Sequence, residues 1–311
     1  MKRYVLILLA FAMTFSFSAC VEKNEEAKDS AKEEVVAEDA ETPAFQPVTG
    51  EWEEYAITIA GAEAFVDSDG KDAIRVYYDF TNNSQETTNA YAELAFAVEQ
   101  DGYEAETTYA DYDNQVEEDE NGSLNIRPGV SIRCVEEYFM KVDGGLLTFA
   151  VSNFWNEEER IEVQFAPKNL PGVPDYELTM LTVEDPQWIV GCPNEGLYDE
   201  MFYVVMEGIE VVDGNDGDPV LRVYYEITNN SEEAANMWFS ADPIVYQDGV
   251  ELCDGFPAET VMEDGNYIED IEPGETIRTS YCYKLKSSNP VEIELADSWT
   301  GEVIGMVCAI D

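Results

Sequence analysis

The chain carries one sequence pattern twice, and this duplication limits the folds open to it. Residues Ala73–Ser84 align without a gap to Val220–Ser231, and the same register pairs Gln100-Asp101-Gly102 with Gln247-Asp248-Gly249. Roughly a third of the positions from 54 to 102 are identical to their counterparts, far above chance for a fixed offset. After a two-residue slip, Pro128-Gly129 meets Pro273-Gly274. We therefore expect two copies of one domain, residues 50–166 and 196–311, joined by a connector, residues 167–195.

Hydrophobic alternation in the repeated segment predicts β-strands. In the first copy one set of alternate positions is apolar and the other is polar or amphipathic: Ile74, Val76, Tyr78 and Phe80 against Arg75, Tyr77 and Asp79. The second copy repeats the apolar set with Leu221, Val223, Tyr225 and Ile227. A period of two indicates an antiparallel sheet with one buried and one wet face. Turn residues every few positions favour an all-β fold of two tandem immunoglobulin-like antiparallel β-sandwich domains.

The turns themselves carry a family resemblance. In both copies a strand ends in Thr-Asn-Asn-Ser (Thr81–Ser84 and Thr228–Ser231), follows an Asp-Gly turn, and precedes Gln-Asp-Gly and a later Pro-Gly. This pattern resembles the domain of unknown function 5067, an immunoglobulin-like, telokin-like module of bacterial surface lipoproteins. The resemblance covers both repeats. It implies a fold and a location, and it transfers no catalytic residue.

The first twenty residues predict export and a lipid anchor. Lys2 and Arg3 precede an apolar run, Val5–Phe17, which is too short for a membrane-spanning helix of about 20 residues. Phe17–Cys20 resembles the lipobox of bacterial lipoproteins, which implies removal of a signal peptide, residues 1–19, and lipid attachment at Cys20. The alternative is a plain signal peptide with a cysteine nearby. Residues 20–49 are expected to form an acidic stalk linker on the extracellular face of the bacterial cell membrane.

Charge and the absence of histidine exclude several functions. The chain has 67 acidic and 16 basic residues, a formal charge of −51, and no histidine. Nucleic acid is repelled by such a charge. Histidine-dependent triads and His-ligated zinc are unavailable, and no cofactor is expected. The acidity is interpreted as an adaptation of a surface protein, with loose sequestration of divalent cations at the cell surface as the alternative.

Two acidic turns at matching places are candidate calcium sites. Asp67–Asp72 and Asp213–Asp218 both alternate carboxylates on a tight loop, which suits a hard cation. Neither fits the EF-hand pattern, and a hairpin turn needs Asp, Asn and Gly in any case. We expect plain turns and no metal site, with weak calcium binding as the alternative.

Four arginines recur in matching pairs, Arg75 with Arg222 and Arg133 with Arg278. They could hold an anionic ligand on the sheet. We expect instead that they pair across strands with acidic side chains, namely Asp79, Glu226 or Glu137.

Tryptophan and cysteine leave alternatives open. Trp155 and Trp299 recur near matching strand ends, where they could stack on sugar rings but are expected to fill a core. Cys134 lies on an apolar strand face and is predicted to be free and buried. Cys253 and Cys282 lie on polar faces, so a disulfide between them is a candidate, although the odd cysteine count argues against it.

These features predict a lipid-anchored surface protein whose two domains bind or space something outside the cell. The expected partners are the membrane, through the N-terminal lipid, and another envelope protein, a cell-wall glycan or a host molecule. No catalytic residue is expected. The alternative is a cell-wall or glycan hydrolase that uses two carboxylates about 5–10 Å apart.

Overall fold

The computed structural model describes residues 45–156, 158–173, 197–198, 201–236, 241–297 and 303–310. The predicted signal peptide, Cys20, most of the stalk and most of the connector lie outside these ranges, as do Cys192 and Trp299. In the described part of the chain, no helix has the length and apolarity needed to cross a bilayer.

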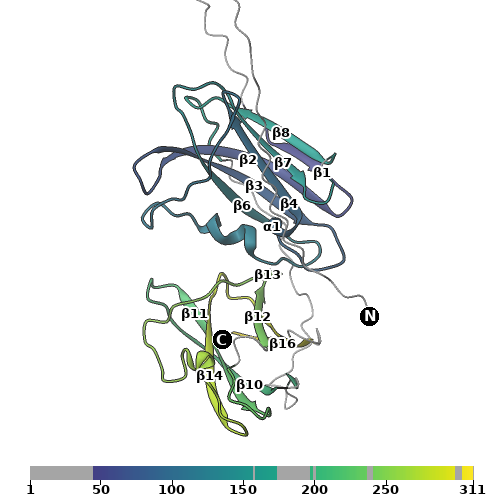
Figure 1. Cartoon of the computed structure of the whole chain (residues 1–311), viewed down its shortest axis with the longest axis vertical. Coiled ribbons are helices and arrows are strands. Elements are labelled where there is room, and N and C mark those ends of the chain that lie inside the picture. The colour runs from purple at the N-terminus through teal and green to yellow at the C-terminus, as the bar shows by residue number, and fades with distance from the viewer. Residues whose placement is uncertain are drawn as a thin grey trace, which may run out of the picture. The chain divides into compact units, whose positions relative to one another are not determined.

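The first repeat is built from two four-stranded antiparallel sheets (Figure 1). One sheet has the order β1-β2-β3-β6, with β1 (Val48–Glu51), β2 (Tyr55–Val66), β3 (Asp72–Asn82) and β6 (Ser131–Phe139). The other has the order β5-β4-β7-β8, with β5 (Tyr103–Glu104), β4 (Leu94–Gln100), β7 (Leu147–Asn153) and β8 (Arg160–Phe165). A helical turn, α1 (Ala90–Glu93), and a 3₁₀ helix, η1 (Glu117–Ser123), lie in the connections.

The second repeat has the same strand orders. Its first sheet runs β9-β10-β11-β14, with β9 (Leu197–Tyr198), β10 (Phe202–Asp213), β11 (Pro219–Asn229) and β14 (Thr276–Lys284). Its second runs β13-β12-β15-β16, with β13 (Val250–Glu251), β12 (Ala241–Gln247), β15 (Val291–Asp297) and β16 (Val303–Cys308). Even the register shift in the long hairpin recurs, at Gly61 in β2 and at Gly208 in β10. The chain is therefore an all-β protein of tandem sandwich domains, as the sequence predicts.

The core of each repeat lies where the alternation places it. The predicted inward positions of β3 and β11 are all fully buried: Ile74, Val76, Tyr78 and Phe80, and Leu221, Val223, Tyr225 and Ile227. In the first repeat they pack with the inner residues of the facing sheet, such as Phe149 and Val151 of β7. In the second repeat Ile293 and Leu295 of β15 have the same role. Burial of these large side chains is the main stabilising contribution.

The sequence predicts that the outer face of β3 is exposed to solvent. This prediction is wrong, because a long connection covers that face. Arg75, Tyr77 and Asp79 are nearly as buried as the inward residues. Val116, in the connection between β5 and β6, packs against a small cluster of Ala60, Tyr77 and Val135 on this outer face. A strand buried on both faces still alternates in sequence here, because its outer side chains are amphipathic and find polar partners on the neighbouring strands and in the covering segment.

Both repeats belong to one compact unit, Ala44–Asp311, and hydrogen bonds connect them. The segment Asn125–Arg127 of the first repeat forms an antiparallel bridge with β13, centred on Ile126 and Val250. The guanidinium of Arg127 lies 3.9 Å from the centre of the Tyr246 ring. It also donates to the carboxylates of Glu292 and Glu294, at 3.0 and 2.6 Å.

Candidate functional site

The asparagine of the Thr-Asn-Asn-Ser motif is structural in both repeats. The Asn82 amide, fully buried, donates to the carbonyls of Glu86 and Ile126 and accepts from the main chain and hydroxyl of Ser84. In the second repeat Asn229 makes the same four bonds, to Glu233, Ile271 and Ser231. One side chain thus closes the turn and fastens a distant loop to it.

The repeated Gln-Asp-Gly is also structural. Buried Gln100 donates to the carbonyls of Lys141 and Gly145 and accepts from the Lys141 amide, which holds the β6–β7 turn against β4. Gln247 holds residues 286–289 in the same way. Asp101 and Asp248 both have a φ of 56°, and a glycine with positive φ follows each. This backbone is that of a two-residue hairpin turn, for which Asp-Gly is a favoured sequence.

The recurring arginines pair with acids, as expected. Arg75 is 3% exposed and binds Glu137 at 2.6 Å, Glu63 at 3.1 Å and the carbonyl of Asn114 at 2.9 Å. Arg133 binds Asp79 at 2.9 Å. No anion-binding function is left to these side chains, because carboxylates and carbonyls already engage them.

The second repeat makes equivalent ion pairs with different partners. Arg222, 2% exposed, binds Asp264 and the carbonyl of Glu259, so the expected partner Glu226 is not used by it. Arg278 binds Glu207 and Glu263. The partners Asp264 and Glu263 lie in the connection between β13 and β14, which therefore covers β11 as its counterpart covers β3.

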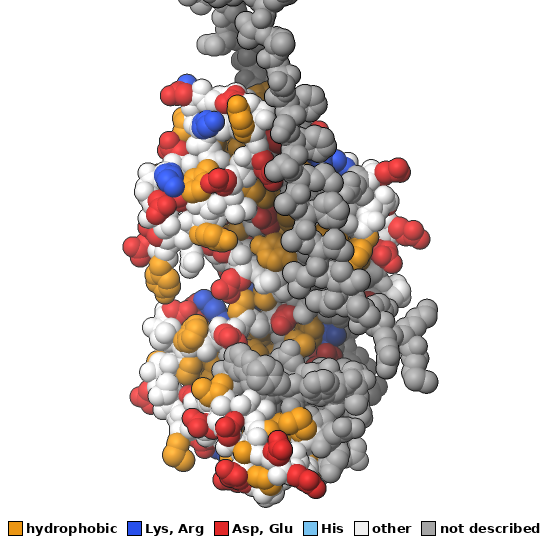
Figure 2. Space-filling model, in the orientation of Figure 1, with side chains coloured by type: hydrophobic (Ala, Val, Ile, Leu, Met, Phe, Trp, Pro, Cys, Tyr) orange, Lys and Arg blue, Asp and Glu red, His pale blue; other side chains and the backbone are white. Residues whose placement is uncertain are grey.

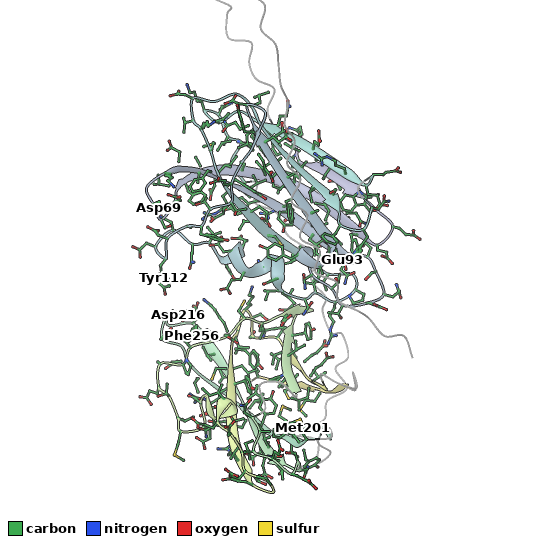
Figure 3. All side chains as sticks on the ribbon, viewed as in Figure 1. Asp69, Glu93, Tyr112, Met201, Asp216 and Phe256 are labelled. Atoms are coloured by element: carbon green, nitrogen blue, oxygen red, sulfur yellow. The ribbon has the colours of Figure 1, made fainter. Side chains whose placement is uncertain are left out.

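The acidic turns are held by their own hydrogen bonds. Asp67 accepts from the amides of Asp69 and Lys71 and from the Thr108 hydroxyl. Burial alone would raise the pKa of Asp67, but these hydrogen bonds outweigh it and lower the pKa. In the second turn Lys284 contacts Asp216 and Asp218 at 3.3 and 2.9 Å. Figure 3 labels Asp69 and Asp216 in the two turns. No group of three metal-ligating side chains occurs among the described residues.

Cys134 is free and fully buried, as predicted. Cys253 and Cys282 are half-buried free thiols in neighbouring segments, which the amide of Gly255 joins by donating to the Cys282 carbonyl. The Cys282 thiol lies 3.9 Å from Asp264, whereas Cys253 packs against the core of the first repeat. A disulfide between Cys253 and Cys282 would need both thiols to turn away from these partners. It stays a prediction, which counting the free thiols of the unfolded, unreduced chain would test.

Trp155 does not fill a core, contrary to expectation. It is 76% exposed in the β7–β8 loop and makes an edge-to-face contact with Phe154, their ring centres 5.1 Å apart. The Asn153 carboxamide caps the Trp155 amide at 2.8 Å. The loop therefore turns this side chain out of the sandwich, although the strand before it is buried.

The end of the β4–β5 hairpin in the first repeat is the candidate binding surface. A groove of about 400 Å³ runs beside it, lined by residues of the β2–β3 turn, the hairpin and the end of β6: Lys71, Asp72, Gln100, Tyr103, Glu104, Ala105, Glu106, Phe139, Met140 and Lys141. Lys71 stacks over Phe139 and Lys141 over Tyr103, at 4.5 and 5.6 Å from the ring centres. Lysine and arginine are sparse among the acidic side chains visible in Figure 2, and two of the lysines line this groove.

A second unusual group is a carboxylate on the inner side of β6. Glu136 follows Cys134 on the strand face that meets the core, and the Tyr78 hydroxyl lies 3.5 Å from its carboxylate. Burial raises the pKa of Glu136 to about 7, although hydrogen bonds from Tyr78, Tyr91 and Tyr138 act to lower it. The first repeat thus holds a carboxyl that titrates near neutral pH.

The sequence patterns predict neither the groove beside the β4–β5 hairpin nor the buried carboxyl of Glu136. Glu136 breaks the apolar alternation of β6, and the aligned position of the second repeat is Tyr281. This difference is visible in the sequence. Tyr103 likewise aligns with Val250 inside an otherwise shared motif. Differences between the copies, more than their common residues, mark the positions that the fold does not require.

The family match agrees with this geometry. The family model described as "Domain of unknown function (DUF5067)" matches residues 25–152 and 194–297, which together exceed half of the chain. The chain belongs to this family and carries two copies of its domain. No curated protein matches the chain.

Two solved structures show limited similarity. One, described as a "putative lipoprotein" from Staphylococcus aureus subsp. aureus NCTC 8325, is 12% identical with a TM-score of 0.32, and the match covers 40% of this chain and 92% of that one. The other, a protein from Enterococcus faecalis solved by NMR, is 21% identical with a TM-score of 0.30, covering 38% and 95%. Similarity at this level does not bear on function.

Proposed function

We propose that the protein is a lipid-anchored component of the outer face of a bacterial cell membrane, whose two sandwich domains, residues 50–166 and 196–311, bind a partner or hold one at a distance from the membrane. The N-terminal apolar run that ends in Phe17–Cys20 supports the anchor. Membership of a family without an assigned activity is compatible with a binding role.

One observation supports binding over catalysis. The polar side chains common to both repeats form hydrogen bonds and ion pairs within the fold. They are Asn82 and Asn229 in turns, Gln100 and Gln247 in hairpins, and Arg75 and Arg222 under loops. Tyr103, which differs from its counterpart Val250, is exposed at the end of a hairpin, where a partner can reach it. No observation on the described residues favours the carboxylate-dependent hydrolase.

Fractionation of cells tests the anchor. We expect the wild-type chain in the membrane fraction, released only by detergent, and Cys20→Ala either unprocessed or in the medium. Cys253→Ala is the matched control and should stay in the membrane fraction. A Cys20→Ala protein that is processed and still membrane-bound would contradict the proposal.

A further inference from the structure

We propose that the end of the β4–β5 hairpin, Gly102–Glu104, is a docking edge for an extended segment of another protein. That segment carries an asparagine, then an apolar residue, then an arginine. This inference rests on the proposed function and deepens it by naming the chemistry of the partner. We call Gly102–Glu104 the first hairpin edge and its counterpart, Gly249–Glu251, the second hairpin edge.

The second hairpin edge shows how such a segment is held. The amide of Arg127 donates to the Gly249 carbonyl and the amide of Glu251 donates to the Asn125 carbonyl, both at 2.9 Å. The Glu251 carboxylate also accepts from the main-chain and side-chain nitrogens of Asn125, at 3.0 and 2.7 Å. A three-residue strand is thereby added to a sheet edge, which is a common mode of peptide recognition.

The first hairpin edge has the same construction. Its register, Gln100 opposite Tyr103 and Glu99 opposite Glu104, matches Gln247 opposite Val250 and Tyr246 opposite Glu251. The Gly102 carbonyl and the Glu104 amide therefore point away from β4, as the bonded groups of Gly249 and Glu251 do. The Glu104 carboxylate takes the place of the Glu251 carboxylate.

This edge carries no strand in the part of the chain that the structure describes. The sheet order leaves β5 outermost. Tyr103 is 71% exposed, whereas Val250, at the same place on the second hairpin edge, is 4% exposed beneath Ile126. An uncovered strand edge with an exposed aromatic residue is a template for pairing with another chain.

The surroundings define the side chains that fit. Phe139, Met140 and Ala105 line the adjacent groove and suit an apolar side chain. Glu99 is exposed and holds the position equivalent to Tyr246, which lies under Arg127 at the second hairpin edge. A positively charged side chain of the partner is therefore favoured next to Glu99. Lys141 corresponds to Lys286, which donates to the side chain of Asn121 at 3.4 Å. Lys141 can likewise donate to a carbonyl of the partner.

A second copy of this chain fits poorly. Its segment aligned with Asn125–Arg127 is Asp270-Ile271-Glu272. Docked in the same register, Asp270 would face Glu104 and Glu272 would face Glu99. Like charges at two of three positions disfavour self-association, so the occupant is a different protein.

A peptide-binding experiment tests the edge. The probe is a fluorescein-labelled peptide with the sequence of residues 121–131, titrated with the full chain in detergent micelles and followed by anisotropy. We expect Glu104→Lys to weaken binding at least tenfold, while Glu158→Lys, an equal charge change on an exposed loop of the same repeat, changes it less than twofold. A peptide with N125D and R127E should also bind at least tenfold more weakly.

Three results would overturn the proposal. Equal binding by wild type and Glu104→Lys would remove the first hairpin edge as the site. Loss of binding in Glu251→Lys but not in Glu104→Lys would place the peptide on the second hairpin edge. Sedimentation showing self-association that Glu104→Lys abolishes would make a second copy the occupant. None of these results depends on the lipid anchor, so failure here and failure of the Cys20 experiment are distinguishable.

Discussion

Each repeat buries one asparagine side chain completely, Asn82 in the first and Asn229 in the second. This side chain bridges two loops that are separated in sequence. Its loss therefore removes the hydrogen bonds within its own turn and the hydrogen bond to the distant loop together. A buried carbonyl or amide left without a partner costs about 1–3 kcal/mol. The motif shared by the two repeats is thus explained by folding, without reference to a ligand.

We predict that Asn82→Ala lowers the free energy of unfolding by roughly 2–4 kcal/mol, because two carbonyls and two donors lose their partner at once. Asn229→Ala should have a similar effect on the second repeat. Urea denaturation followed by tryptophan fluorescence measures it. Asn83→Ala, at the exposed next position, is the control and should change the value by less than about 0.5 kcal/mol.

Glu136 makes the stability of the first repeat depend on pH. Its pKa is about 7 in the folded chain, above the ordinary value of 4.5, so the folded state favours the neutral carboxyl. The stability contributed by that proton is fully present below about pH 4.5 and is lost as the pH rises through 7.

We predict that Glu136→Gln raises the free energy of unfolding at pH 8 by roughly 1–3 kcal/mol and has little effect at pH 4.5, because the amide cannot ionise. Urea denaturation at the two pH values measures the difference. Glu99→Gln, an exposed position of the same repeat, should leave both values unchanged. A Glu136→Gln chain with the wild-type pH profile would show that this carboxyl is not the titrating group.

At the scale of elements, a buried arginine fastens a long connection to the first sheet of each repeat. In the first repeat Arg75 joins β3 to β6 through Glu137 and to the connection through the Asn114 carbonyl. In the second, Arg222 joins β11 to the covering connection through Asp264 and Glu259. Removing one member of such a pair leaves the other charge buried without a partner.

Arg75→Met is expected to lower the free energy of unfolding by about 3–5 kcal/mol, since Glu137 would remain a buried charge. The double substitution Arg75→Met with Glu137→Leu should recover much of the loss. Limited proteolysis should cut the connection near Asn114 faster in the single variant. Arg160→Met, which breaks an exposed pair with Glu162, should cost about 0–1 kcal/mol. Equal losses in the two single variants would contradict a special contribution of Arg75.

The strands and their inner faces could be predicted from sequence because alternation is a local signal. Val76 and Tyr78 lie inward as the period of two requires. The covering of Arg75 could not be predicted, because it depends on where a distant connection lies, and Arg75 reads as a surface residue from its neighbours alone. Its pairing with Glu137 could still be anticipated, because acidic residues flank it on the adjacent strand.

Candidate surfaces were less predictable than the fold. Trp155 was expected inside because large aromatic residues usually fill cores, and only the loop geometry around Asn153 turns it outward. The hairpin edge could be located from Gln100-Asp101-Gly102. Whether that edge is covered depends on tertiary contacts that a local pattern does not contain.

At the scale of the whole molecule, the Arg127 side chain connects the two repeats. It stacks on Tyr246 and binds two glutamates of β15. We predict that Arg127→Met separates the unfolding of the repeats into two calorimetric transitions, where the wild type shows one, because the coupling loses roughly 2–4 kcal/mol. Lys168→Met, which breaks an exposed pair with Asp143, should keep one transition. Two transitions already present in the wild type would show that the repeats are not coupled through this side chain.

The placement of the few cations bears on the resistance of the chain to proteases. Enzymes of trypsin specificity cleave after lysine or arginine, and this chain has 16 of these residues in 311. Arg75 and Arg222 lie beneath covering loops, and the Arg133 side chain is only 13% exposed. Cleavage requires a flexible and accessible site. These three arginines, of the 16 basic residues, are therefore poor sites for such enzymes, whereas exposed side chains such as Lys71 and Lys168 are accessible to them.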